Sequence, residues 1–259
     1  MGSGCPEGTD AFRLRLPSLS ECLGAILLYG PLGVALAILT PRGGGGMVEF
    51  DPAWGLLLAA AVVAVHEGTH ALAYALLTRR IPRVGAKSYC VYVSMEGVPV
   101  GRRSFTAVAL STLVGLSAVL LILKALAGEW PWGAMYLMNL AGSSGDFVLA
   151  VESAAFPPDS TVLDAGDSAL VCVKRGWRPP GWLGRFRKFL RRAAAALPPA
   201  LAVSILAGLR VHVERRGLFE ETVWIEVDPL AVAVGYAVGI ALALALTGRG
   251  ESEALPRPG

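Results

Sequence analysis

The segment His66-Glu67-Gly68-Thr69-His70 carries the residue types best suited to metal chemistry. Two histidines at positions i and i+4 project from the same side of a helix, so both imidazoles can reach one ion. A glutamate directly after the first histidine can act as general base on a water molecule that the ion activates. The chain has only three histidines, and two of them lie here. The spacing predicts a Zn²⁺ site on a helix, with His66 and His70 as ligands and Glu67 as the catalytic base.

The composition indicates that this segment belongs to a membrane protein. Of the 259 residues, 54% are hydrophobic and 17% are charged, and the mean hydropathy is +0.56. A soluble domain carries about 25% charged residues, so this composition argues against a soluble globular domain and against a disordered chain. The net charge is only +3, and the basic residues are scattered among loops, which argues against a nucleic-acid partner.

Six apolar segments approach the length that a helix needs to cross a bilayer, about 17–25 residues. We therefore expect an all-α membrane protein made of one polytopic domain, residues 1–259. Alternating residues at Lys87–Met95 and Thr161–Val173 predict short cytoplasmic β-hairpins. Lysine and arginine crowd the loops after the second and fourth spans, so the positive-inside rule places both termini in the cytoplasm of a prokaryotic cell. The predicted spans are residues 22–40, 54–78, 105–127, 132–156, 193–209 and 229–247.

Asp146, in the fourth predicted span, is the best candidate for a third ligand. Catalytic zinc usually takes three protein ligands and a water molecule, and His212 falls in a predicted external loop. His70 lies nine residues before Arg79, and Asp146 lies eleven before Pro157. Both therefore sit roughly 14–16 Å from the cytoplasmic ends of spans that run the same way. Ionisable side chains near mid-membrane cost at least about 2.5 kcal/mol each and usually mark function; the alternative is a polar helix-packing interface.

Asn139 shares a helix face with Asp146, because Asn139, Gly142, Ser143 and Asp146 follow the i, i+3, i+4, i+7 pattern. The small residues Gly142 and Ser143 allow a neighbouring helix to approach closely. Asn139 is the only asparagine in the chain. We predict a catalytic role for it, as a hydrogen-bonding partner of the substrate backbone or of a developing oxyanion. We weigh a plain interhelical hydrogen bond equally.

These motifs resemble two kinds of membrane metallopeptidase. HExxH in the second span with an aspartate in the fourth looks like the site-2 protease type, whose NxxPxxxxDG motif supplies an Asn and an Asp. Here the segment Asn139–Asp146 is one residue shorter, with Gly142 in place of proline and Phe147 in place of glycine. HExxH followed by N-x-x-G-S-x-G-D more closely resembles the putative zincin peptidase family of small prokaryotic membrane proteins. That resemblance extends over the second to fourth spans and the D-x-G-D hairpin, Asp164–Asp167.

The leading interpretation is a zinc-dependent metallopeptidase that hydrolyses peptide bonds in or near the membrane. Its expected partners are the lipid bilayer and a membrane protein or peptide substrate. The stretch Lys87–Met95 could pair with an extended substrate as an added β-strand, although a plain capping hairpin is the simpler interpretation. The alternative function is a non-catalytic metal-binding scaffold or a metal carrier. A carrier usually needs polar residues at several depths, whereas here they cluster at one level beside the base Glu67.

Two further features of the composition give weaker predictions. The four cysteines make no CxxC pair, so we expect isolated buried thiols; Cys90 and Cys172 are the pair that could lie close together. Glutamine is absent and asparagine occurs once, and this scarcity of thermolabile amides fits a thermophilic source.

Overall fold

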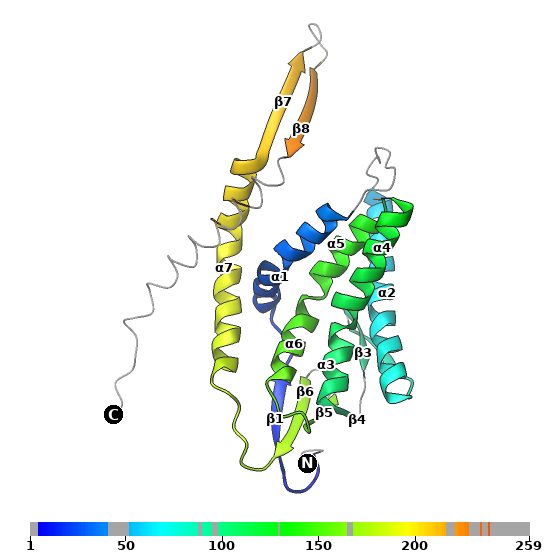
Figure 1. Cartoon of the computed structure of the whole chain (residues 1–259), viewed down its shortest axis with the longest axis vertical. Helices are drawn as coiled ribbons and strands as arrows, with labels where there is room; N and C mark the ends of the chain where they lie inside the picture. The colour runs from blue at the N-terminus through cyan, green and yellow to red at the C-terminus, as the bar shows by residue number, and fades with distance from the viewer. Residues whose placement is uncertain are drawn as a thin grey trace, which may run out of the picture.

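The structure is a computed structural model that describes residues 5–40, 52–87, 90–94, 98–128, 130–164, 168–215 and 221–227, with residues 234 and 238. These residues are mostly helical and include one four-stranded antiparallel sheet and two separate two-stranded hairpins. The helices lie side by side as a bundle, and the four-stranded sheet lies at one end of that bundle (Figure 1).

Three helical runs are long and apolar enough to cross a membrane, which indicates a membrane protein. Large apolar side chains remain exposed along them, as a lipid-facing surface requires. The first run is α1 (Leu19–Leu39), and the second is nearly all of α2 (Pro52–Thr78). The third joins α3 (Arg102–Leu110), the π-helical turn η1 (Ser111–Leu116) and α4 (Ser117–Ala127).

The other three predicted spans are not among these candidate spans. Span 132–156 is divided into two consecutive helices, α5 (Trp132–Gly142) and α6 (Ser144–Ala154), which meet at Ser143. Span 193–209 falls within a longer helix, α7 (Trp182–Gly208), whose first half is rich in arginine. Span 229–247 lies outside the described residues. The described part of the chain therefore shows three candidate spans, and the prediction of about six transmembrane helices is not shown.

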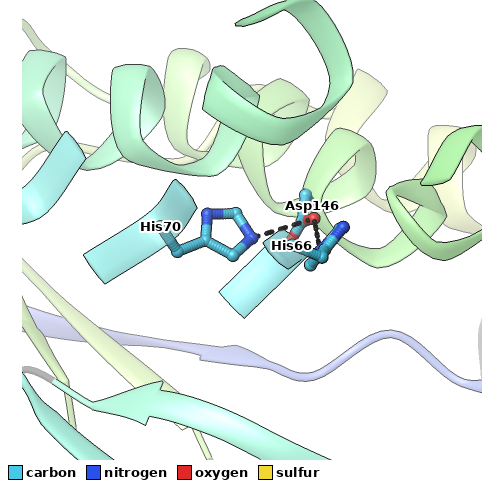
Figure 2. Close-up of side chains that lie close together, drawn as sticks. All are labelled: His66, His70 and Asp146. Atoms are coloured by element: carbon cyan, nitrogen blue, oxygen red, sulfur yellow. Dashed lines mark hydrogen bonds and ion pairs between the residues drawn. The ribbon is translucent and has the colours of Figure 1, made fainter. Parts of the chain in front are cut away.

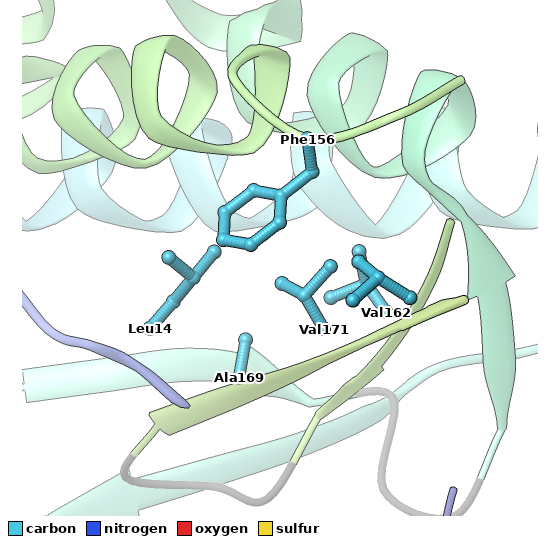
Figure 3. Packing of buried hydrophobic residues seen from close by; sticks show 6 residues of the cluster. Leu14, Phe156, Val162, Ala169 and Val171 are labelled. Atoms are coloured by element: carbon cyan, nitrogen blue, oxygen red, sulfur yellow. The ribbon is translucent and has the colours of Figure 1, made fainter. Parts of the chain in front are cut away.

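The four-stranded sheet has the order β1-β6-β5-β4 and is antiparallel throughout. The pairing of β5 with β6 confirms the hairpin predicted at Thr161–Val173, whereas β1 and β4 were not predicted. Leu14, Val162 and Val171 pack beneath Phe156, at the end of α6, and join the sheet to the bundle (Figure 3). The strands are β1 (Thr9–Arg15), β4 (Pro99–Gly101), β5 (Thr161–Asp164) and β6 (Ser168–Lys174).

Two further hairpins stand apart from this sheet. β2 (Arg83–Lys87) pairs with β3 (Cys90–Ser94), which confirms strand structure in the stretch 87–95. β7 (Leu209–Arg215) pairs with β8 (Glu221–Val227) and continues directly from α7 (Figure 1), where the sequence predicted a loop.

A disulfide bond between Cys5 and Cys172 corrects the expectation of isolated thiols, and also the suggested pairing of Cys172 with Cys90. Cys5 precedes β1, and β1 pairs with β6, so the sheet brings together two cysteines that are 167 residues apart. Cys22, in α1, is a free cysteine.

Helix α7 is fixed to α1 by close packing and by buried charge. A Cβ atom at Gly24 would lie 2.0 Å from the Leu190 carbonyl oxygen, so only glycine permits this approach. Two carboxylates with 1% exposure, Glu21 of α1 and Glu152 of α6, both bind the guanidinium of Arg187. Nη2 of Arg187 lies 2.6 Å from Oε2 of Glu152, and Nη1 lies 3.3 Å from Oε2 of Glu21. The arginine-rich half of α7 is thus ion-paired with the bundle.

Candidate metal centre

Helix α2 presents His66 and His70 on one side, as the i, i+4 spacing predicts. Their ring centroids are 4.9 Å apart, and each residue is 9% exposed. A Cβ atom at Gly142, in α5, would lie 3.9 Å from the His66 ring. That is an ordinary van der Waals distance, so Gly142 places α5 directly beside the His66 ring.

Asp146 reaches the same point from the first turn of α6. Its Oδ2 atom lies 3.1 Å from Nε2 of His66 and 3.2 Å from Nε2 of His70 (Figure 2). One ligand atom from each of the three residues can be chosen so that all lie within 4.8 Å of one another. The division of the fourth predicted span at Ser143 places Asp146 at a helix N-terminus, where a carboxylate is favoured by the helix dipole.

The hydrogen bonds of Asn139 fix the tautomer of His66. The Asn139 amide nitrogen donates to the carbonyl oxygen of Thr112 and to Oγ of Ser117, both at 3.0 Å. The amide oxygen Oδ1 therefore faces His66, and Nδ1 of His66 lies 2.9 Å from it. Because Oδ1 can only accept, Nδ1 of His66 carries a proton, and Nε2 is the nitrogen that faces Asp146.

A backbone carbonyl fixes the tautomer of His70 in the same way. Nδ1 of His70 lies 2.9 Å from the carbonyl oxygen of Val108 and must donate to it. The two Nε2 atoms and one carboxylate oxygen then face one another, so that unprotonated Nε2 atoms and Asp146 could hold one cation together. Metal-binding histidines usually donate their second nitrogen to a carbonyl or carboxylate in this manner. The donor set of two imidazoles and one carboxylate fits Zn²⁺ with an open fourth position.

Glu67 is half-buried and follows His66 directly in α2. Its Oε2 atom accepts a hydrogen bond from the backbone N–H of Val93, in β3, at 3.2 Å. The β2–β3 hairpin thus lies against the proposed catalytic base. Sequence reasoning did not assign Val93 to the site. Nearly every residue type has a backbone N–H, so the sequence does not show which one donates to Glu67.

Two other residues, Asn139 and His212, were considered for the site in the sequence. Asn139 is fully buried, and both of its amide hydrogens are donated within the protein, so the structure shows the interhelical alternative. The catalytic role of Asn139 at an oxyanion stays a prediction. His212 lies in β7 and is not one of the three residues that converge.

Comparisons with known proteins agree with a zinc site. A family model described as "Putative zincin peptidase" matches residues 59–161. This stretch is less than half of the chain, and it contains the HEGTH segment, Asn139 and Asp146. The match indicates a zinc metallopeptidase, while no similarity to site-2 proteases is found. No curated protein and no solved structure matches the chain.

Proposed function

We propose that this protein is a membrane-embedded zinc metallopeptidase that hydrolyses peptide bonds in or near the bilayer. The observation that carries the proposal is the convergence of His66 Nε2, His70 Nε2 and Asp146 Oδ2, with Glu67 beside the first histidine. Both histidines lie within the candidate span Ala53–Thr78. The match to the zincin peptidase family supports the same chemistry.

The residues have separate roles in this reaction. His66, His70 and Asp146 would hold Zn²⁺, which would supply a Lewis acid for the scissile carbonyl and the attacking water. The Glu67 carboxylate takes a proton from the water as the new C–O bond forms. It gives that proton to the amine nitrogen as the C–N bond breaks, and so returns to its ionised form. Asn139 and the Val108 carbonyl hold the two imidazoles in the required orientation.

The outer edge of β3 supports a substrate in extended conformation. Val93 is opposite Val84 in the hairpin register, yet its N–H is directed to Glu67 and not to β2. A peptide that paired with this edge as an added strand would bring its backbone carbonyls close to Glu67. We propose that the substrate is a membrane-spanning or membrane-proximal segment that unwinds locally to bind here.

Metal content and cleavage together test the proposal. The wild type, Asp146→Ala and Glu67→Gln are purified in detergent, bound metals are quantified, and a quenched fluorescent peptide with an apolar spanning segment is the substrate. We expect about one zinc per chain in the wild type and a large loss of zinc in Asp146→Ala. Glu67→Gln should retain zinc and lose about 10²–10⁴-fold in cleavage rate, the usual contribution of a general base.

The matched control is Thr69→Val, which alters the same motif at a hydroxyl that bonds to the Val65 carbonyl oxygen. It should retain both zinc and cleavage. A folded wild type without zinc would refute the proposed metal centre. Cleavage by Glu67→Gln at the wild-type rate would refute the catalytic mechanism and favour a metal-binding scaffold.

A further inference from the structure

The π-helical turn η1 packs against α2 and α5 and supplies polar groups to three residues of the metal centre. The Ser111 hydroxyl lies 3.4 Å from Nδ1 of His70. The Thr112 carbonyl accepts the Asn139 amide, and the Thr112 hydroxyl donates to Oδ2 of Asp146 at 3.1 Å. Such wide helical turns occur frequently at functional sites. One short segment thus contacts residues contributed by α2, α5 and α6.

Thr112 occupies the centre of a buried hydrogen-bond chain. Thr112 and Ser143 are both 0% exposed. An ionised carboxylate can only accept hydrogen bonds, so the single hydroxyl proton of Thr112 is given to Asp146. The Ser143 hydroxyl lies 2.9 Å from the Asn139 carbonyl oxygen and 3.3 Å from the Thr112 hydroxyl, and it can donate its single proton to only one of the two. The Thr112 hydroxyl thus lies in a buried polar cluster and donates to Asp146.

We propose that Thr112 is a positioning residue for Asp146 and thereby increases the affinity of the centre for its metal. The oxygen that receives the Thr112 proton is Oδ2, the same atom that faces Nε2 of both histidines. A donor on one side of Oδ2 fixes the carboxylate rotamer and leaves the side facing the histidines for the cation. This inference rests on the metal centre proposed above.

A purely structural role for Thr112 makes a different prediction. Polar side chains in membrane helices commonly form hydrogen bonds that only join one helix to the next. Thr106 is such a residue in the same helical run: its hydroxyl lies 2.8 Å from Oγ of Ser153 and bonds to the Arg102 carbonyl oxygen. Loss of a hydrogen bond that only connects two helices changes the unfolding midpoint and leaves the affinity of the metal site unaltered. Loss of a hydrogen bond that orients a metal ligand changes the affinity of the metal site itself.

Cobalt binding to the full-length protein in detergent distinguishes the two roles. Co²⁺ is titrated as the probe, and its visible absorption spectrum reports the geometry of the bound ion. Thr112→Val removes the hydroxyl and keeps the side-chain shape. We expect this variant to bind Co²⁺ about 10–100-fold more weakly, the usual cost of losing an outer-sphere partner, with an altered spectrum. Thr112→Ser should restore affinity and spectrum, and Thr106→Val should match the wild type in both.

The remaining outcomes separate this inference from the proposed function. A folded Thr112→Val that binds Co²⁺ with wild-type affinity and spectrum would overturn the positioning role and leave the metal centre standing. A wild type that binds no Co²⁺ would overturn both. If Thr112→Val does not fold, Thr112→Ala replaces it in the comparison with Thr112→Ser. Equal affinities in Thr112→Ala and Thr112→Ser would then overturn the inference.

Discussion

Asn139 connects the metal centre to neighbouring helices through all of its side-chain polar atoms. Replacing it with alanine would leave the Nδ1 proton of His66 and the Thr112 carbonyl without this partner in a buried site. An unsatisfied buried polar group costs about 1–3 kcal/mol, so Asn139→Ala should lower the free energy of unfolding by at least that amount. Because the His66 ring is no longer held, zinc affinity should also fall about 10–100-fold. Denaturant unfolding in detergent and competition with a zinc chelator measure the two effects.

The neighbouring Met138 offers a matched control, since it lies on the same helix and is 37% exposed. Met138→Ala should leave the affinity for zinc unchanged. Wild-type zinc affinity in a folded Asn139→Ala would show that His66 keeps its orientation without the amide. In that case the interhelical hydrogen bonds of Asn139 would serve stability alone.

At the scale of elements, the ion pairs of Arg187 make α7 part of the bundle. Arg187→Met keeps most of the side-chain length and removes the ion pair of the buried Glu152, while Glu21 keeps its ion pair with Arg191 at 2.8 Å. Breaking a buried ion pair on one side usually costs about 3–5 kcal/mol. We expect a loss of stability of that order, measured as a lower denaturation midpoint in detergent. Arg185→Met, on an exposed position of the same helix, should have little effect, and equal losses in the two variants would contradict this account.

The elements with local sequence signals were predictable, and those defined by distant partners were not. The shared face of the i, i+4 histidines follows from helix periodicity, and the predicted depth of Asp146 follows from the rise per residue. The hairpin at Thr161–Val173 follows from alternation. Strand β1 gains its structure from β6, more than 150 residues away. The start of α7 looked like a basic loop, because the carboxylates that pair with Arg187 lie on two other helices. The turn η1 has no sequence signature, although Ser111, Thr112 and Ser117 in an apolar span were a usable indication of polar contacts.

At the scale of the whole molecule, the predicted orientation determines from which side water and substrate reach the centre. The run Arg102–Ala127 has 26 residues, and at 1.5 Å per residue it spans roughly 39 Å. Since the hydrocarbon core is about 30 Å thick, the two ends of this run must lie on opposite sides if it crosses. The arginines at its start predict that this end is cytoplasmic. The metal centre, whose partner Thr112 belongs to the same run, would then be reached from the cytoplasm.

Cysteine labelling in intact spheroplasts tests this orientation. Single cysteines are introduced at Arg103 and Ala127, both exposed, in a background that carries Cys22→Ser and Cys90→Ser. A membrane-impermeant maleimide should label Ala127→Cys at once and Arg103→Cys only after permeabilisation. The unlabelled background protein controls for the disulfide-bonded pair Cys5 and Cys172. The reverse pattern would place the start of α3 outside the cell. The metal centre with Glu67 would then be reached by substrates from the exterior.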